Sequence, residues 1–185
     1  SQRLPTTVAA TTAGPFAIHP GMRTGGPLRA SRLGNTGIGG NGYLDYGCTN
    51  DALRPAGWSS VFVRAGAAGN GTRANPYGTI GQALAAAGDA RMIVCVASGA
   101  YRENLDLGMQ RRRMLVGGLN STFTARNPLA SPAIVTAADA DQHVMRAEAP
   151  AELVIDGFVV TGSRNRGIEA TAWDANERIT LRNNH

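Results

Sequence analysis

Residues 69–104, GNGTRANPYGTIGQALAAAGDARMIVCVASGAYREN, contain the pattern that decides the fold. A Gly- and Asn-rich loop leads into TIGQALAAAG (79–88), where Thr79 is a suitable N-cap, apolar residues recur at helical spacing and Gly88 is a suitable stop. The run RMIVCVAS (91–98) then has the continuous apolar character of a buried strand. The stretch therefore predicts a short amphipathic helix directly before a buried strand.

The chain beyond this stretch predicts many short strands separated by turns. The strand-like runs are RRMLVGGLN, PAIVTA, HVMRAE, ELVIDGFVVTG, RGIEATA and RITLRNNH. Equivalent positions Ile155 and Leu181 lie 26 residues apart, and LVGGLN begins 39 residues before VIDGFV. A repeat of this size built from strands and turns predicts a solenoid. The runs lack the alternation of a β-sandwich, and no later helical pattern supplies the crossovers of a doubly wound sheet.

Residues 59–185 resemble the first coils of right-handed parallel β-helix proteins of the pectin lyase-like superfamily. The motifs that carry the resemblance are NPYGTIGQALAAAGDARMIVCVASGAYREN, LVGGLNSTFTARNP and LVIDGFVVTG. The resemblance implies an all-β, right-handed parallel β-helix (a solenoid), whose short N-terminal helix covers the apolar cross-section of the first coil. The helix residues expected to form this cap are Ile80, Ala83, Leu84 and Ala87. The superfamily includes lyases, hydrolases, epimerases and adhesins, so the resemblance implies no single activity.

Residues 1–57 differ in composition from the rest of the chain. Gly, Pro, Thr and Asn recur throughout, and neither a helical nor a strand period persists. We therefore expect an extended N-terminal arm at 1–57, and the cap and first coils of the β-helix at 58–185. The motif GIGGNG (Gly37–Gly42) imitates a dinucleotide-binding loop, but it lacks the preceding strand and following helix, so we expect a flexible loop.

The composition restricts the class of partner and the compartment. All 18 basic residues are arginine, as in proteins from GC-rich bacterial genomes, and the net charge of +5 permits acidic partners such as anionic polysaccharide. The scattered arginines do not form a nucleic-acid surface, and no apolar run approaches the roughly 18 residues of a membrane span. Cys48 and Cys95 allow one disulfide, which would pin the arm to the first coil; two free thiols are the alternative.

Two short loops contain candidate binding residues. SRNRG places Arg164 and Arg166 in one turn, where their forked guanidinium groups could hold a carboxylated sugar. AADADQH places Asp139 and Asp141 two residues apart, as in some calcium loops, although a solvated turn is the simpler interpretation. We expect no cofactor, with calcium at these aspartates as the single alternative.

No pattern in the sequence predicts catalytic residues. Lyases of this superfamily typically need a base beside a cation, and its hydrolases need clustered aspartates. Asp156 has no second carboxylate at 154 or 158, so we expect a turn or an interior polar residue. The histidines share no metal-ligand spacing; they are His19, His143 and His185.

These patterns favour a non-catalytic β-helix region of a secreted or cell-surface bacterial protein, used for binding, scaffolding or assembly. One alternative is the N-terminal part of a polysaccharide lyase or related carbohydrate-active enzyme, with a site mostly beyond residue 185. Another is a self-contained small binding module or a different fold. RITLRNNH resembles a strand entering a turn, so we expect an open apolar end near Ile179 and Leu181 that further coils or another subunit would cover. The partners expected are polysaccharide or a protein subunit, without nucleic acid.

Overall fold

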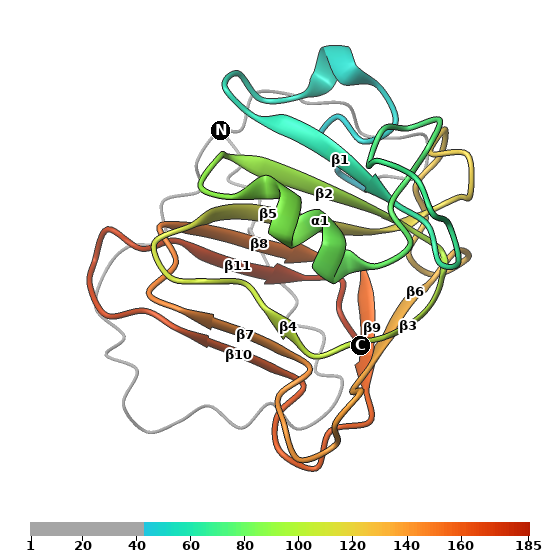
Figure 1. Ribbon diagram of the computed structural model, residues 1–185. Coiled ribbons are helices and arrows are strands. Elements are labelled where there is room, and N and C mark those ends of the chain that lie inside the picture. The colour runs from blue at the N-terminus through green and yellow to red at the C-terminus, as the bar shows by residue number, and fades with distance from the viewer. Residues whose placement is uncertain (1–42) are drawn as a thin grey trace, which may run out of the picture.

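The computed structural model describes residues 43–185 and shows a mostly β protein with three parallel sheets (Figure 1). The sheet of order β1-β2-β5-β8-β11 contains Ser59–Val63, Met92–Ala97, Arg112–Leu119, Glu152–Asp156 and Ile179–Arg182. The sheet of order β10-β7-β4 contains Ile168–Thr171, Met145–Glu148 and Leu105–Asp106. The sheet of order β3-β6-β9 contains Gly99–Arg102, Ala133–Thr136 and Phe158–Thr161. The described helices are α1 (Ile80–Ala87) and the 3-10 helix η1 (Asp51–Leu53).

The chain enters the three sheets in a repeated order. The strands β2, β3 and β4 lie in three different sheets, the next two sets of three strands repeat that order, and β11 returns to the five-stranded sheet. Ile155 pairs with Leu181 in parallel register, which confirms the 26-residue repeat. Leu115 pairs with Ile155, so the true offset between these strands is one residue longer than the 39 residues between LVGGLN and VIDGFV. The predicted all-β class with parallel strands is therefore confirmed.

Gly157 divides a run that the sequence presented as one strand. ELVIDGFVVTG forms both β8 and β9, which belong to different sheets. Gly157 has φ +87°, and a Cβ at this position would lie 2.9 Å from the carbonyl oxygen of Gly117. Both the backbone conformation and the close approach require glycine, so the chain can turn sharply from one sheet into the next.

Alternate strand residues fill the space between the sheets with aliphatic side chains. Val94, Leu115 and Ile155 come from three neighbouring strands of the five-stranded sheet and are fully buried in this interior cluster. Their partners from the other sheets include Val135 and Met145. Because the strands are parallel and in register, each one adds a layer of apolar side chains to the same core.

The helix α1 packs against β1, β2 and β4 and contributes Ile80, Ala83 and Ala87 to the interior cluster. These three side chains are buried as expected, but Leu84 is only half-buried. Leu84 still packs against the interior cluster, so it lies on the same side of the helix as the three buried residues. It also lines a surface pocket between α1 and β4.

The N-terminal end of α1 is held by side chains on two elements. Thr79 and Gln82 form a capping box. The Glu103 carboxylate, which follows β3, accepts hydrogen bonds from the N–H groups of Ile80 and Gly81 at 2.9 and 2.7 Å. A carboxylate at a helix N-terminus also interacts favourably with the helix dipole. Glu103 therefore fixes the first turn of α1 on the sheets.

The outer face of the five-stranded sheet is covered by the described part of the arm. Tyr46 and Cys48 are buried there in a second apolar cluster with Trp58 and Phe62. Cys48 and Cys95, the expected disulfide pair, are bonded, with Cα atoms 5.6 Å apart. Residues 44–48 therefore pack on the sheet, and the disulfide joins them covalently to β2.

A buried polar network joins the arm to the last strands. Asp156, at the end of β8, is fully buried and pairs with the buried guanidinium group of Arg126 at 2.7 Å. The Tyr46 hydroxyl donates to the Asp156 carboxylate at 3.2 Å, and the Asn183 amide donates to it at 2.7 Å. Arg182 lies 3.4 Å from the same carboxylate. Asp156 is thus an interior polar residue, one of the two roles expected for it.

The strands β9, β10 and β11 form one edge of their respective sheets. Leu181 in β11 is 41% exposed and Ile179 is partly buried, so apolar side chains are accessible where an open end was expected. Among residues 43–185, no helix is long and apolar enough to cross a bilayer. The loop Gly37–Gly42 and His19 lie outside the described residues.

Candidate functional site

Two stacked turns bring the predicted binding residues together. Arg164, in the turn between β9 and β10, donates its N–H to the Ala140 carbonyl at 2.7 Å, across to the turn between β6 and β7. Ser163 donates its hydroxyl to the Gln142 carbonyl at 2.8 Å. Asp141 lies in the same turn as Ala140. The SRNRG and AADADQH motifs, which are separate in the sequence, therefore form one surface.

The arginines of these turns already have carboxylate partners. Arg164 pairs with Asp141 at 3.3 Å, and both side chains are largely exposed. Arg166 pairs with Glu169. A sugar carboxylate would have to displace these internal partners. An arginine that is exposed to water and already paired with a carboxylate attracts a further anion only weakly. The geometry therefore weakens the hypothesis that Arg164 and Arg166 form an anion site.

Asp139 and Asp141 form a turn. The Asp139 carboxylate accepts the N–H of Asp141 at 3.0 Å, which is the usual local hydrogen bond of an aspartate in a turn. The Asn104 side chain receives the N–H of Asp139 at 2.7 Å and donates to the His143 carbonyl at 2.7 Å. In the described part of the chain, no group of three or more His, Cys, Asp or Glu side chains is arranged to hold a metal ion.

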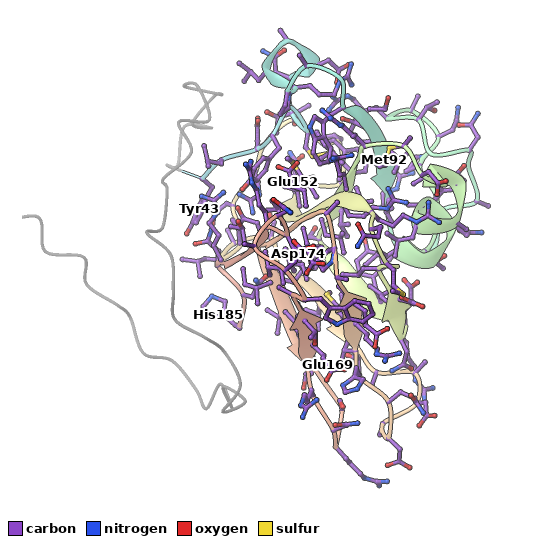
Figure 2. All side chains as sticks on the ribbon, turned by 90° about the vertical axis from the view of Figure 1, so that its left-hand side faces the viewer. Tyr43, Met92, Glu152, Glu169, Asp174 and His185 are labelled. Atoms are coloured by element: carbon purple, nitrogen blue, oxygen red, sulfur yellow. A yellow bond between two sulfur atoms is a disulfide. The ribbon has the colours of Figure 1, made fainter. Side chains whose placement is uncertain are left out.

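A charged row lies across β4, β7 and β10. Asp106, Arg146 and Glu169 occupy the same register position on the three strands. Glu169, toward the lower end of Figure 2, also meets His143, whose Nε2 lies 2.9 Å from its carboxylate. The Arg146 guanidinium lies 3.5 Å from that carboxylate. Sequence spacing did not connect His143 with Glu169, because the contact depends on the pairing of β7 with β10.

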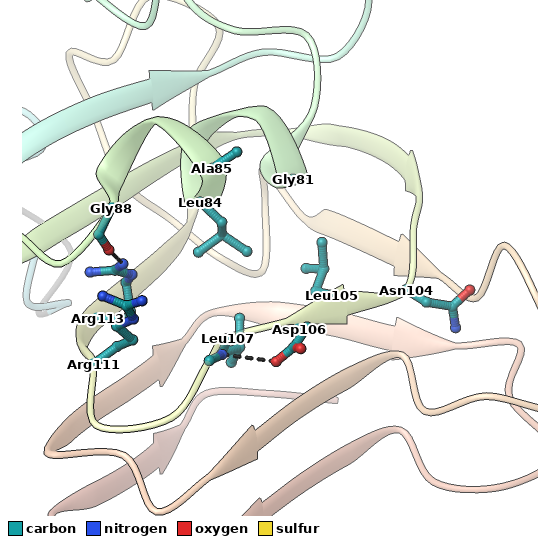
Figure 3. A pocket seen from close by; sticks show the side chains of 11 residues that line it. Gly81, Leu84, Ala85, Gly88, Asn104, Leu105, Asp106, Leu107, Arg111 and Arg113 are labelled. Carbon is teal, nitrogen blue, oxygen red and sulfur yellow. Dashed lines mark hydrogen bonds between the residues drawn. The ribbon is translucent and has the colours of Figure 1, made fainter.

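The pocket between α1 and β4 has a volume of about 380 Å³, at the lower end of the range for small-molecule sites (Figure 3). We call it the cap pocket. Its leucine wall consists of Leu84, Leu105 and Leu107, and its arginine end consists of Arg111 and Arg113. The remaining lining residues are Gly81, Ala85, Gly88, Asn104, Asp106 and Gly108. The pocket therefore combines an apolar surface with a cationic end.

The arginine end carries a buried charge without a carboxylate partner among residues 43–185. Arg113 is 4% exposed and donates to the carbonyls of Ala90 at 2.6 Å, Arg112 at 3.2 Å and Gly88. Burial lowers the pKa of Arg113, and the neighbouring Arg111 lowers it further. Arg111 pairs with Asp89, whose side chain is 85% exposed. The positive potential at this end is therefore only partly neutralised.

The arginine end has a signal in the sequence, in the run Arg111, Arg112 and Arg113. Arg111 and Arg113 stand two residues apart at the entrance to β5, and side chains at that spacing point to the same face of a strand. The intervening Arg112 is exposed and does not line the cap pocket. What the sequence could not supply was the position of α1, which forms the opposite wall.

Guanidinium donors and apolar surface converge in this pocket, and such a combination is chemically suited to an anionic group with an apolar part. No protein-family model, curated protein or solved structure matches this chain.

Proposed function

We propose that the chain forms the cap and first coils of a right-handed parallel β-helix. The support is the repeated entry of successive strands into three parallel sheets, with Ile155 paired with Leu181 one repeat further on. A right-handed path is the usual one for parallel strands joined by a crossover. The apolar side of α1 packs on the interior at the β1 and β2 end, which is the position of a cap. As part of the same proposal, we infer that the chain is related to the pectin lyase-like superfamily, which its motifs resemble.

We infer that this region serves binding, scaffolding or assembly in a secreted or cell-surface bacterial protein, and that it does not catalyse. The disulfide Cys48–Cys95 favours an oxidising compartment. One observation carries the non-catalytic part of the proposal: three buried or partly buried carboxylates are engaged in structural contacts. Asp156 is buried beneath the arm, Glu103 caps α1, and Glu169 is held by His143 and two arginines.

Activity against uronate polymers tests this proposal. Incubation of the full disulfide-bonded chain with polygalacturonate and alginate should produce neither 4,5-unsaturated ends, measured by ultraviolet absorbance, nor new reducing ends. Both products should stay at the level of a heat-denatured control with and without added calcium. Product formation in proportion to protein concentration would contradict the non-catalytic role and favour the carbohydrate-active enzyme.

The compartment has a separate test. Thiol titration of the unfolded protein should find no free thiol after export into an oxidising compartment, and two after reduction. Chain made in a reducing compartment should show lower stability that recovers on oxidation, because the bond restrains the arm. Equal stability of the oxidised and reduced forms would remove the argument from the disulfide.

A further inference from the structure

We propose that the cap pocket binds a small monocarboxylate with an aliphatic tail, with the carboxylate at the arginine end and the tail against the leucine wall. This inference gives a ligand class to the binding role proposed above and rests on it. The ligand class follows from the charge at one end of the pocket and the apolar surface along its side.

The charge at the arginine end selects an anion. Arg113 has five N–H donors, and the three carbonyls of Ala90, Arg112 and Gly88 take only part of this capacity. Because carbonyl oxygens carry no net charge, they satisfy hydrogen bonds without neutralising the guanidinium group. A carboxylate between Arg111 and Arg113 would supply the missing charge and accept the remaining donors in a bidentate manner.

The leucine wall selects an aliphatic tail. Leu105 and Leu107 are 4% and 3% exposed, while Leu84 is half-buried and points from α1 into the gap above them (Figure 3). A tail placed there would cover the accessible side of Leu84 and extend the apolar contact from α1 to β4. Removing apolar surface from water in this way is favourable in proportion to the area covered.

Asp106 restricts the ligand to one carboxylate. Its side chain lines the same pocket, and one of its oxygens accepts the Gly108 N–H at 2.9 Å. A second anionic group near this carboxylate would be repelled, so dicarboxylates should bind less well than monocarboxylates. The Asn104 amide is already occupied by Asp139 and His143, and it points away from the leucine wall in Figure 3.

Titration of the full disulfide-bonded chain with hexanoate, followed by calorimetry and amide chemical shifts, tests the inference. Hexanoate should bind saturably and shift the amides of Gly81, Leu84 and Gly108. Acetate, which lacks the tail, and hexanol, which lacks the charge, should each bind at least about tenfold more weakly.

Charge variants provide matched controls. Arg111→Gln should weaken hexanoate binding about tenfold, whereas Arg112→Gln removes the same charge from the adjacent exposed position and should leave binding unchanged. Asp89→Asn should strengthen binding, because it releases Arg111 from its internal partner. Leu84→Ala should weaken hexanoate more than acetate. Thermal unfolding of each variant reports whether the fold is retained.

Three results would overturn the inference: no saturable hexanoate binding to the parent chain, equal binding of hexanoate and hexanol, or an equal loss in Arg111→Gln and Arg112→Gln. These outcomes are independent of the uronate assay. Failure of hexanoate binding removes the ligand class and leaves the scaffold role standing, whereas uronate cleavage removes the non-catalytic role whatever the pocket binds.

Discussion

Two buried arginines of this protein differ in how their charge is compensated. Arg126, on the outer side of the five-stranded sheet, is fully buried and pairs with the equally buried carboxylate of Asp156 at 2.7 Å. Arg113, at the cap pocket, is almost as buried but contacts only carbonyl oxygens among the described residues. The first arginine is neutralised within the fold, and the second keeps a positive potential at a surface pocket.

The difference shows that local counter-charge, more than the number of arginines, decides where an anion could bind. Arg164 and Arg166 resemble an anion site in sequence, yet Asp141 and Glu169 already neutralise them. Arg113 is 4% exposed, and a buried charge without a counter-charge acts more strongly than a charge at an exposed turn. Three of the following four tests compare these arginines, and the other concerns the buried tyrosines.

The largest effect is expected for Asp156→Ala, which leaves Arg126 buried without its partner. We expect a loss of about 3–5 kcal/mol in the free energy of unfolding, because the guanidinium charge becomes uncompensated in a dry environment. Denaturant unfolding measures the loss. The matched control is Asp51→Ala, which breaks the exposed pairs with Arg54 and Arg73 and should cost at most about 1 kcal/mol. Similar losses in the two variants would mean that the Asp156 network contributes no more than a surface pair.

A smaller effect is expected from alkaline pH. Burial, and next the nearby Asp156 carboxylate, raise the pKa of Tyr46 to about 12; burial raises the pKa of Tyr101 to about 12. The neutral phenols are therefore favoured in the folded state. Their contribution is fully present below pH 10, the ordinary pKa of tyrosine in an unfolded chain, and is lost as pH rises toward about 12.

Ionisation of each tyrosine should therefore lower the free energy of unfolding by about 2 kcal/mol across this pH window. Unfolding free energies measured in steps from neutral to alkaline pH check the slope. Tyr46→Phe and Tyr101→Phe should each flatten the decline. If stability is constant through the window in the parent chain, the two hydroxyl groups are not protected by the fold.

The helix and the parallel strands could be predicted from the sequence, whereas the ion pairs could not. The helix at 80–87, the apolar strand after it and the repeat linking Ile155 with Leu181 are local or periodic patterns, and the structure contains all of them. The Asp156 network has no such pattern, because Tyr46 and Arg126 lie 110 and 30 residues away in the chain. Their meeting depends on how the arm and a loop pack on the outer face.

The cap pocket, too, could be predicted from the sequence only in part. The Arg111–Arg113 spacing places two guanidinium groups on one side of β5, which the sequence displays directly. The pocket itself exists because α1 leaves Leu84 half-buried above β4, and that position depends on packing over the whole interior. Local patterns therefore indicate which residues share a face, but not which faces meet.

A third test compares the two buried arginines directly. Arg113→Met removes a charge that has no counter-ion and three hydrogen bonds to carbonyls near the end of α1. These carbonyls can be hydrated at the surface, so we expect a loss of about 1–2 kcal/mol in the free energy of unfolding. Arg126→Met should cost clearly more, because the buried Asp156 carboxylate loses its closest charged partner and, among the described residues, keeps only Arg182 at 3.4 Å. Equal losses of stability in Arg113→Met and Arg126→Met would contradict this expectation, because they would mean that the charge of Arg113 is compensated as well as that of Arg126.

The smallest effect is expected at the stacked turns. Arg164 and Asp141 are 80% and 72% exposed and lie 3.3 Å apart, so water and salt screen their attraction and both side chains lose freedom when they pair. A double-mutant cycle of Arg164→Ala and Asp141→Ala should give a coupling energy of about 0.5 kcal/mol or less. Repetition at high salt should bring the coupling to zero. A coupling above about 1 kcal/mol that persists in salt would contradict this expectation, because Arg164 and Asp141 would then hold each other as firmly as a buried pair does.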